Sequence, residues 1–254
     1  MILHSAEAGA GAPVVLLHGL FGAARNLGVL TRALSPFYHV VALDLRNHGD
    51  SPHDPHMDYT AMARDVADTL AHLGLSHVRL CGHSMGGKTA MMLALTRPDM
   101  VSHLAVMDIA PVSYQHNYLD LARAMLDIPL SPGLTRADAE QFLARAVKEP
   151  PMRAFLLNNL VLGPQPHWRV GLSEISTNME NLFRWDDPDH MSPYGGPALF
   201  LCGAASDYVK AAAAPEIRRR FPQARIEYVA DAAHWLHADK PEIVVAALRE
   251  FFAS

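Results

Sequence analysis

Short apolar runs alternate along this chain with segments that place apolar residues on one helical face. Six of the runs are rich in Val, Leu or Ile, and several of them are apolar at nearly every position, which is typical of parallel strands covered on both faces. They are residues 13–19, 38–44, 77–82, 103–109, 197–203 and 225–230. Alternating strands and helices predict an α/β protein with a mostly parallel sheet flanked by helices.

Three helices are predicted beside these strands. Across residues 59–74 the apolar positions recur three or four apart, and Gly74 closes the segment. Residues 84–97 predict a helix that ends before Pro98, because the residue before a proline disfavours the helical conformation. The last helix is expected to begin at Pro241, a residue suited to the first helical turn.

Residues 111–192 break this alternation. Residues 135–147 and 173–183 have helical patterns, and prolines separate the segments around them. We therefore expect a core formed by residues 1–110 and 193–254, with residues 111–192 inserted as a helical cap.

The most informative motif is GHSMG, which spans residues 82–86 at a predicted strand-to-helix junction. In a nucleophile elbow, glycines on both sides allow a turn tight enough to present the serine hydroxyl above the sheet edge. Ser84 is therefore the candidate nucleophile. The N–H of Met85, at the start of the helix, is a candidate donor to an oxyanion.

A second donor is expected from the glycine-rich stretch HGLFG, which follows the first strand. We assign it to Leu20, with Phe21 as the neighbouring possibility, because glycines leave backbone amides accessible. The polar stretch DLRNHGDSP, residues 44–52, follows the second strand and is interpreted mainly as a structural loop.

A serine nucleophile needs a base, and the base needs a carboxylate that orients it. His234 is the candidate base because it joins the last strand to the last helix, at the same sheet edge as Ser84. His237 is interpreted as peripheral. Asp108 and Asp207 each follow a predicted strand, and both give the chain order Ser, Asp, His.

Composition narrows the function classes. The 21 Lys and Arg residues against 26 Asp and Glu residues give a net charge of −5, which argues against nucleic acid or an anionic membrane as partner. No apolar run is long enough for a membrane span, and the first residues lack a basic leader, so we expect a cytoplasmic protein. Cys81 and Cys202 are interpreted as buried thiols. The oligomeric state stays open.

The motifs HGLFG, DLRNHGDSP, GHSMGGK, DIAPV and DAAHW occur in this order over nearly the whole predicted core. With them the chain resembles the α/β-hydrolase superfamily, and more narrowly the small bacterial esterases and acyl-thioesterases related to abhydrolase-domain proteins. The resemblance implies Ser84 as nucleophile and His234 as base.

The same resemblance bears on the acid. In most α/β-hydrolases the acid lies three residues after the glycine of a late strand; counted from Gly203, that place is Ser206, and Asp207 comes one residue later. The narrower esterase group carries the acid in the DIAPV motif instead. Asp108 is therefore favoured over Asp207.

These residues predict a serine hydrolase that cleaves small-molecule carboxylic esters or thioesters of short to medium acyl groups through an acyl-enzyme, without a metal or an organic cofactor. Phe21 and Trp235 are candidates for its substrate pocket. A carbon–carbon hydrolase or lactonase with the same triad is the alternative. A non-catalytic ligand-binding protein is a further one, because a fold does not dictate its function.

Overall fold

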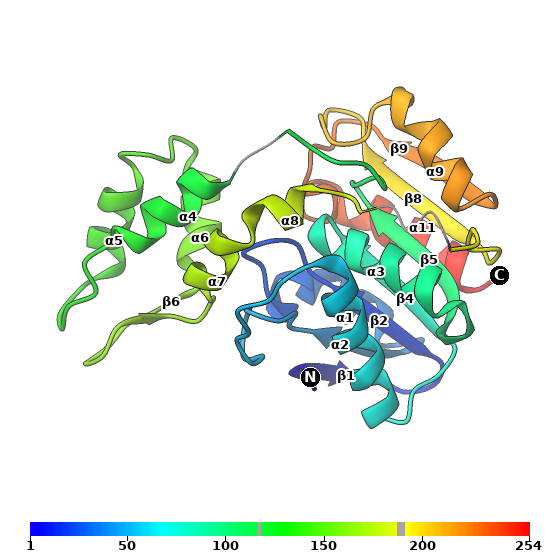
Figure 1. Ribbon diagram of the computed structural model, residues 1–254, viewed down its shortest axis with the longest axis horizontal. Coiled ribbons are helices and arrows are strands. Elements are labelled where there is room, and N and C mark those ends of the chain that lie inside the picture. The colour runs from blue at the N-terminus through cyan, green and yellow to red at the C-terminus, as the bar shows by residue number, and fades with distance from the viewer. Residues whose placement is uncertain (116–117, 187–190) are drawn as a thin grey trace.

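The computed structural model describes residues 1–115, 118–186 and 191–254, in which a seven-stranded sheet has the order β1-β3-β2-β4-β5-β8-β9 (Figure 1). The strands are β1 (Ser5–Ala8), β2 (Pro13–Leu17), β3 (His39–Leu43), β4 (Val78–His83), β5 (Val101–Met107), β8 (Ala198–Gly203) and β9 (Ala224–Val229). All neighbours pair in parallel except β1, which is antiparallel to β3. The predicted parallel sheet and its six strands are confirmed, whereas β1 was not predicted.

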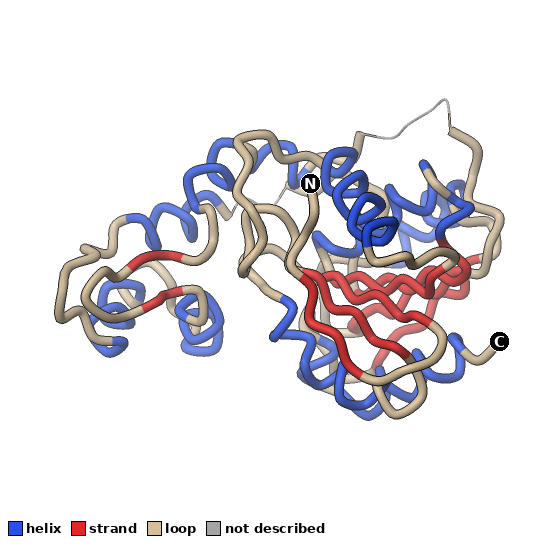
Figure 2. The backbone as a smooth tube through the Cα atoms, turned by 90° about the horizontal axis from the view of Figure 1, so that it is seen from below, coloured by secondary structure: helices blue, strands red, loops and turns tan. Residues whose placement is uncertain are grey.

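Helices cover both faces of this sheet, as Figure 2 shows. Within β2, Val15 and Leu17 pack in one apolar cluster with residues of α2, α3 and α9, while Val14 and Leu16 pack in a second cluster with α1 and α11. Every position of the strand after Pro13 is thus buried, which explains its continuous apolar run. These helices are α1 (Gly28–Leu34), α2 (Tyr59–His72), α3 (Met85–Thr96), α9 (Ala214–Arg220), α10 (Leu236–Asp239) and α11 (Pro241–Phe252), with the 3₁₀ helices η1 (Ala24–Leu27), η2 (Pro98–Met100) and η3 (Ala211–Ala213).

The three helices predicted beside the strands are confirmed as α2, α3 and α11, and local chemistry sets two of their ends. Asp58 begins α2 by accepting a hydrogen bond from the N–H of Ala61 at 2.7 Å. Gly74, with φ of +69°, follows its end. Pro241 occupies the first position of α11, where its missing N–H is of no consequence.

Residues 111–192, here called the cap segment, lie between β5 and β8 and extend beside the sheet (Figure 1). Their elements are α4 (Leu119–Leu126), α5 (Arg136–Leu143), α6 (Pro150–Leu157), β6 (Leu160–Val161), β7 (His167–Trp168), α7 (Leu172–Thr177) and α8 (Met179–Phe183). The helix predicted over residues 173–183 is two short helices, α7 and α8. The division into core and cap stays a prediction, because residues 116–117 and 187–190 near its boundaries lie outside the described residues.

Cys81 and Cys202 are both buried and free, as predicted. Burial raises the pKa of each thiol to about 12, so neither is a reactive thiolate near neutral pH. Among the helices of the described residues, none is long and apolar enough to cross a membrane.

Candidate active site

Ser84 lies in the turn between β4 and α3, with φ of 52° and ψ of −118°. Backbone crowding explains why this turn requires glycine on both sides. A Cβ atom on Gly82 would lie 2.2 Å from the carbonyl oxygen of Gly86, and one on Gly86 would lie 2.5 Å from that of His18. The strained serine is therefore held in a turn that side chains at either glycine would break.

The structure brings Ser84, His234 and Asp108 into one hydrogen-bonded row. His234 lies between β9 and α10, with its Nε2 atom 3.0 Å from the Ser84 Oγ and its Nδ1 atom 2.8 Å from the Asp108 Oδ2. An ionised carboxylate can only accept hydrogen bonds, so it fixes the imidazole proton on Nδ1. Nε2 then has a lone pair directed at the serine hydroxyl, which is the arrangement that activates a nucleophile.

Asp108 directly follows β5 and is fully buried among hydrogen-bond donors. Its Oδ1 atom accepts from the N–H of Gly203 at 2.9 Å, and its Oδ2 atom also accepts from the hydroxyl of Ser206. Asp207 is exposed instead, and its Oδ1 atom lies 2.7 Å from the Nζ of Lys210. Of the two candidate acids, Asp108 thus contacts the histidine, and Ser206, three residues after Gly203, contacts Asp108.

Three further rings surround His234 that the sequence did not single out for this position. The Tyr208 ring stacks on the His234 ring with centroids 3.9 Å apart and planes inclined by 16°. His83 donates from Nε2 to the His234 carbonyl at 2.9 Å and thereby fixes the loop that carries it. His237, interpreted from sequence as peripheral, packs against His83 and lines the cavity above Ser84.

Burial lowers the pKa of both neighbouring imidazoles. The pKa of His83 is held well below its ordinary value by burial and then by repulsion from His237 and His234. Burial lowers the pKa of His237 to about 4. Neither ring therefore adds positive charge beside His234 near neutral pH.

Two backbone N–H groups are candidates for an oxyanion hole, those of Leu20 and Met85, and both residues line a small cavity together with Ser84. Within the described part of the chain, the N–H groups of Leu20 and Met85 have no acceptor. The N–H of Phe21 donates to the Nε2 of His48 at 3.1 Å, so it is occupied, and Leu20 remains the candidate donor from this loop. The loop passes directly over the nucleophile, because a Cβ on Gly19 would lie 3.3 Å from that of Ser84.

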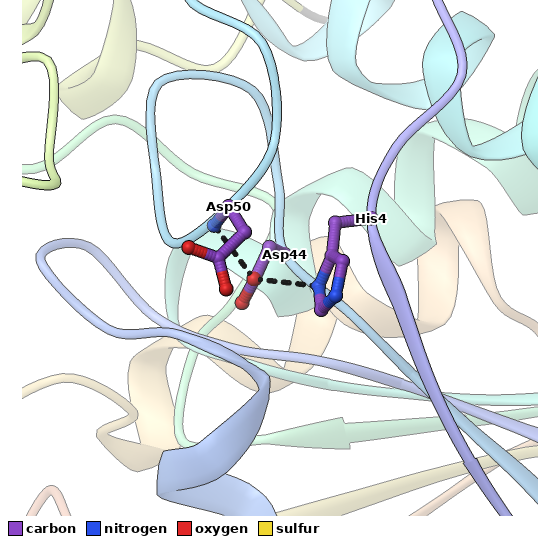
Figure 3. A group of neighbouring side chains, drawn as sticks. All are labelled: His4, Asp44 and Asp50. Atoms are coloured by element: carbon purple, nitrogen blue, oxygen red, sulfur yellow. Dashed lines mark hydrogen bonds and ion pairs between the residues drawn. The ribbon is translucent and has the colours of Figure 1, made fainter.

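The loop of residues 44–52, here called the β3 loop, packs against the loop that carries Leu20 and stabilises it. Asp44 accepts from the N–H of Ala24 at 2.7 Å through Oδ1, and from His4 and the N–H of Asp50 through Oδ2, as Figure 3 shows for the last two. These contacts agree with the structural role that its sequence suggested.

The same three side chains, His4, Asp44 and Asp50, are a possible metal-binding group, since their ligand atoms lie within 4.8 Å of one another. The Nδ1 atom of His4 lies 3.0 Å from the Oδ2 atom of Asp44. In this structure the group connects the N-terminal strand to the β3 loop through hydrogen bonds.

A cavity of about 250 Å³ lies above Ser84 and His234. Its walls are mostly apolar and come from both the core and the cap segment. They include both sequence-predicted pocket residues, Phe21 and Trp235, and the Trp235 ring packs on Phe155 of α6 with centroids 5.5 Å apart. Other apolar lining residues are Leu20, Leu27, Tyr118, Leu121, Met152 and Tyr208.

Comparisons with known proteins agree with this geometry. The profile of the family described as alpha/beta hydrolase fold matches residues 12–241. Esterase YbfF of Escherichia coli (strain K12) is 37% identical over 240 residues, which cover 94% of this chain and 92% of that protein. The sn-1-specific diacylglycerol lipase ABHD11 of Mus musculus is 42% identical over 250 residues, covering 94% of this chain and 80% of that one. A solved structure, a marine microorganism esterase, superposes with a TM-score of 0.95 at 34% identity and covers 98% of this chain and 99% of its own.

Proposed function

This chain belongs to the α/β-hydrolase fold family and to its esterase group of serine hydrolases, and we propose that it cleaves carboxylic esters of short to medium acyl groups through an acyl-enzyme on Ser84. The observation that carries the proposal is the row Ser84, His234 and Asp108 at the base of an apolar cavity. Acyl thioesters undergo the same chemistry and are included in the proposed substrate class.

In the acylation step, the Ser84 oxygen attacks the ester carbonyl while His234 takes the hydroxyl proton on Nε2. The tetrahedral intermediate collapses as the bond to the leaving oxygen breaks, and His234 returns the proton to that oxygen. A water molecule then repeats the sequence on the acyl-enzyme, releasing the acid and restoring the serine.

Two features lower the barrier to these steps. Asp108 stabilises the imidazolium that forms when His234 takes the proton, and it does so from a fully buried position. The negative charge that develops on the carbonyl oxygen is stabilised by the N–H groups of Leu20 and Met85, the latter at the positive end of the twelve-residue helix α3.

The size of the cavity supports the choice of acyl group. Its volume of about 250 Å³ lies just below the range of roughly 300–1,000 Å³ that is usual for sites binding drug-sized ligands. Apolar walls favour an acyl chain, and this volume suits a chain of modest length.

The test is hydrolysis of p-nitrophenyl esters from acetate to decanoate by the purified protein, alongside Ser84→Ala and Ser173→Ala. Ser173 lies exposed on α7 and provides a matched control. We expect Ser84→Ala to lose about 10⁴-fold or more in kcat/KM and to lose labelling by a fluorophosphonate, with Ser173→Ala unaffected. Retained turnover or labelling in Ser84→Ala would show that another residue is the nucleophile, and a maximum at the longest chains would contradict the proposed acyl length.

A further inference from the structure

Phe21 is held at both ends of its backbone by buried side chains that lie far from it in the sequence. Its N–H donates to His48 Nε2 at 3.1 Å, and its carbonyl oxygen accepts from Asn159 Nδ2 at 2.7 Å. Its φ of 59° is in the left-handed region, which a phenylalanine seldom adopts without support from its surroundings. The residue immediately before it is Leu20, whose N–H is the proposed oxyanion donor.

His48 supplies the contact from the core. It is fully buried in the β3 loop, and its Nδ1 donates to the carbonyl oxygen of Arg46 at 2.9 Å. The proton is thereby fixed on Nδ1, which leaves the lone pair on Nε2 directed at the N–H of Phe21. Burial and repulsion from His18 lower the pKa of His48 to about 3, so this acceptor persists throughout the neutral range.

Asn159 supplies the contact from the cap segment, just before β6. It is 1% exposed, and its Nδ2 atom also donates to the carbonyl oxygen of Leu156 at 3.3 Å. Two carbonyl acceptors require the amide nitrogen on this side, so Oδ1 faces the other way. Asn159 therefore directs its amide nitrogen at the carbonyl oxygen of Phe21.

Further contacts connect the same part of the cap segment with the core. Arg25 donates to the carbonyl oxygen of Asn158 at 2.8 Å, and the N–H of Gly171 donates to that of Asn47 in the β3 loop at 2.8 Å. Asn159 therefore lies where the cap segment contacts both the β3 loop and the loop of Phe21.

We propose that Asn159 and His48 are positioning residues for ester hydrolysis, which clamp the backbone of Phe21 so that the N–H of Leu20 points at the oxyanion. This inference rests on the function proposed above. It makes the oxyanion hole depend on how the cap segment is seated, because one half of the clamp belongs to that segment. Without the clamp, Phe21 relaxes from its strained conformation and the preceding peptide rotates with it.

The test compares Asn159→Leu and Asn159→Ala with the control Asn158→Ala. Asn158 is exposed, and its side-chain oxygen accepts from Arg136 of the cap segment itself. We expect roughly a 10–100-fold loss in kcat with little change in KM for the Asn159 variants, since displacing a donor weakens transition-state binding and leaves ground-state binding intact. Asn159→Ala only removes atoms and serves as the second variant where leucine is not accommodated.

A trifluoromethyl ketone that carries the acyl chain of the best substrate provides the readout that a merely structural role would not change. Ser84 adds to it to form an alkoxide in the oxyanion hole, whereas the matching methyl ketone stays largely unreacted. We expect its inhibition constant to rise in the Asn159 variants by the same factor as kcat falls, with the methyl ketone unaffected. His48→Gln, which keeps an acceptor, should retain most of the affinity that His48→Leu loses.

The outcomes separate the two proposals. Unchanged trifluoromethyl ketone affinity in Asn159→Ala, with Ser84→Ala inactive, would refute the clamp and leave the proposed function standing. Activity in Ser84→Ala would overturn the function itself. Equal losses in Asn158→Ala and Asn159→Ala would show a general loosening of the cap segment and would likewise refute the role of Asn159.

Discussion

Lys88 places an ionisable amine inside the protein, and replacing it with methionine is expected to change how stability depends on pH. The side chain is 1% exposed and lies in α3. Its Nζ atom donates to the carbonyl oxygens of Phe183 and Arg184 at 3.3 and 3.0 Å, at the C-terminal end of α8. The same atom lies about 5 Å from the ring centroids of Tyr59 and Tyr114, at 5.2 and 5.0 Å.

Burial lowers the pKa of Lys88 from 10.5 to about 7, with only a partial offset from the charge of Asp186. The unfolded chain stays protonated between these two values, whereas the folded protein has lost the proton. Stability therefore rises with pH in this window, by up to about 1.4 kcal/mol per pH unit. From pH 7 to 8.5 the contribution of Lys88 is about 2 kcal/mol, less than the full slope would give because the folded group is still half protonated at pH 7. For a chain of this size, that corresponds to a melting temperature higher by about 4–8 °C.

Urea unfolding at pH 7.0 and 8.5 measures this gain directly. Other groups also change charge in this window, among them the N-terminal amine, whose pKa is raised above its ordinary value by a hydrogen bond to Asp65, so the gain is compared between variants that share these groups. The wild-type protein and Lys148→Met, which removes an exposed lysine, should each gain about 2 kcal/mol more than Lys88→Met. Equal gains in all three proteins would refute the assignment of the effect to Lys88.

Two further predictions concern the elbow and the acid. Asp108→Asn should lower kcat by about 10⁴-fold, because a neutral amide neither fixes the imidazole proton nor stabilises the imidazolium. Asp207→Asn should leave kcat within about twofold. Comparable losses of kcat in steady-state assays of both variants would contradict the role of Asp108. Gly82→Ala should lower the free energy of unfolding by about 3 kcal/mol, since its Cβ would lie 2.2 Å from the Gly86 carbonyl oxygen. Gly74→Ala, with φ of +69° but nothing within 4 Å of its Cβ, should cost about 1 kcal/mol in the same urea titration.

The central strands were predictable from sequence because their environment leaves a simple pattern. Residues 13–17, buried after the first position, appear as a continuous apolar run. β1 runs along the edge of the sheet as Ser5–Ala8, partly exposed and without a bulky apolar residue, so nothing in its composition distinguishes it from a loop. The two-residue strands β6 and β7 are too short for any periodicity to be detected.

In the site, too, some residues could be predicted from the local sequence, whereas others depend on long-range contacts. Ser84 could be identified because its glycines are required by the turn itself, and His234 because its loop follows the last strand. Ser206 follows a strand's glycine by three residues, the spacing at which most α/β-hydrolases are expected to carry the acid. This spacing could have identified Ser206 as a residue of the site. Asn159 gave none, because its partner is a backbone carbonyl 138 positions away, and every residue has such a carbonyl.

Strained residues that follow the three adjacent strands β2, β4 and β5 explain why the long-range contacts are needed. Each is followed at the site by a residue with positive φ, namely Phe21, Ser84 and Asp108. Such conformations cost roughly 1–3 kcal/mol each and persist only when neighbouring groups fix them. The glycines of the elbow fix Ser84, and buried donors fix the carboxylate of Asp108. The backbone of Phe21 is instead held by side chains from the β3 loop and the cap segment, so changes in the cap segment should reach the chemistry through it.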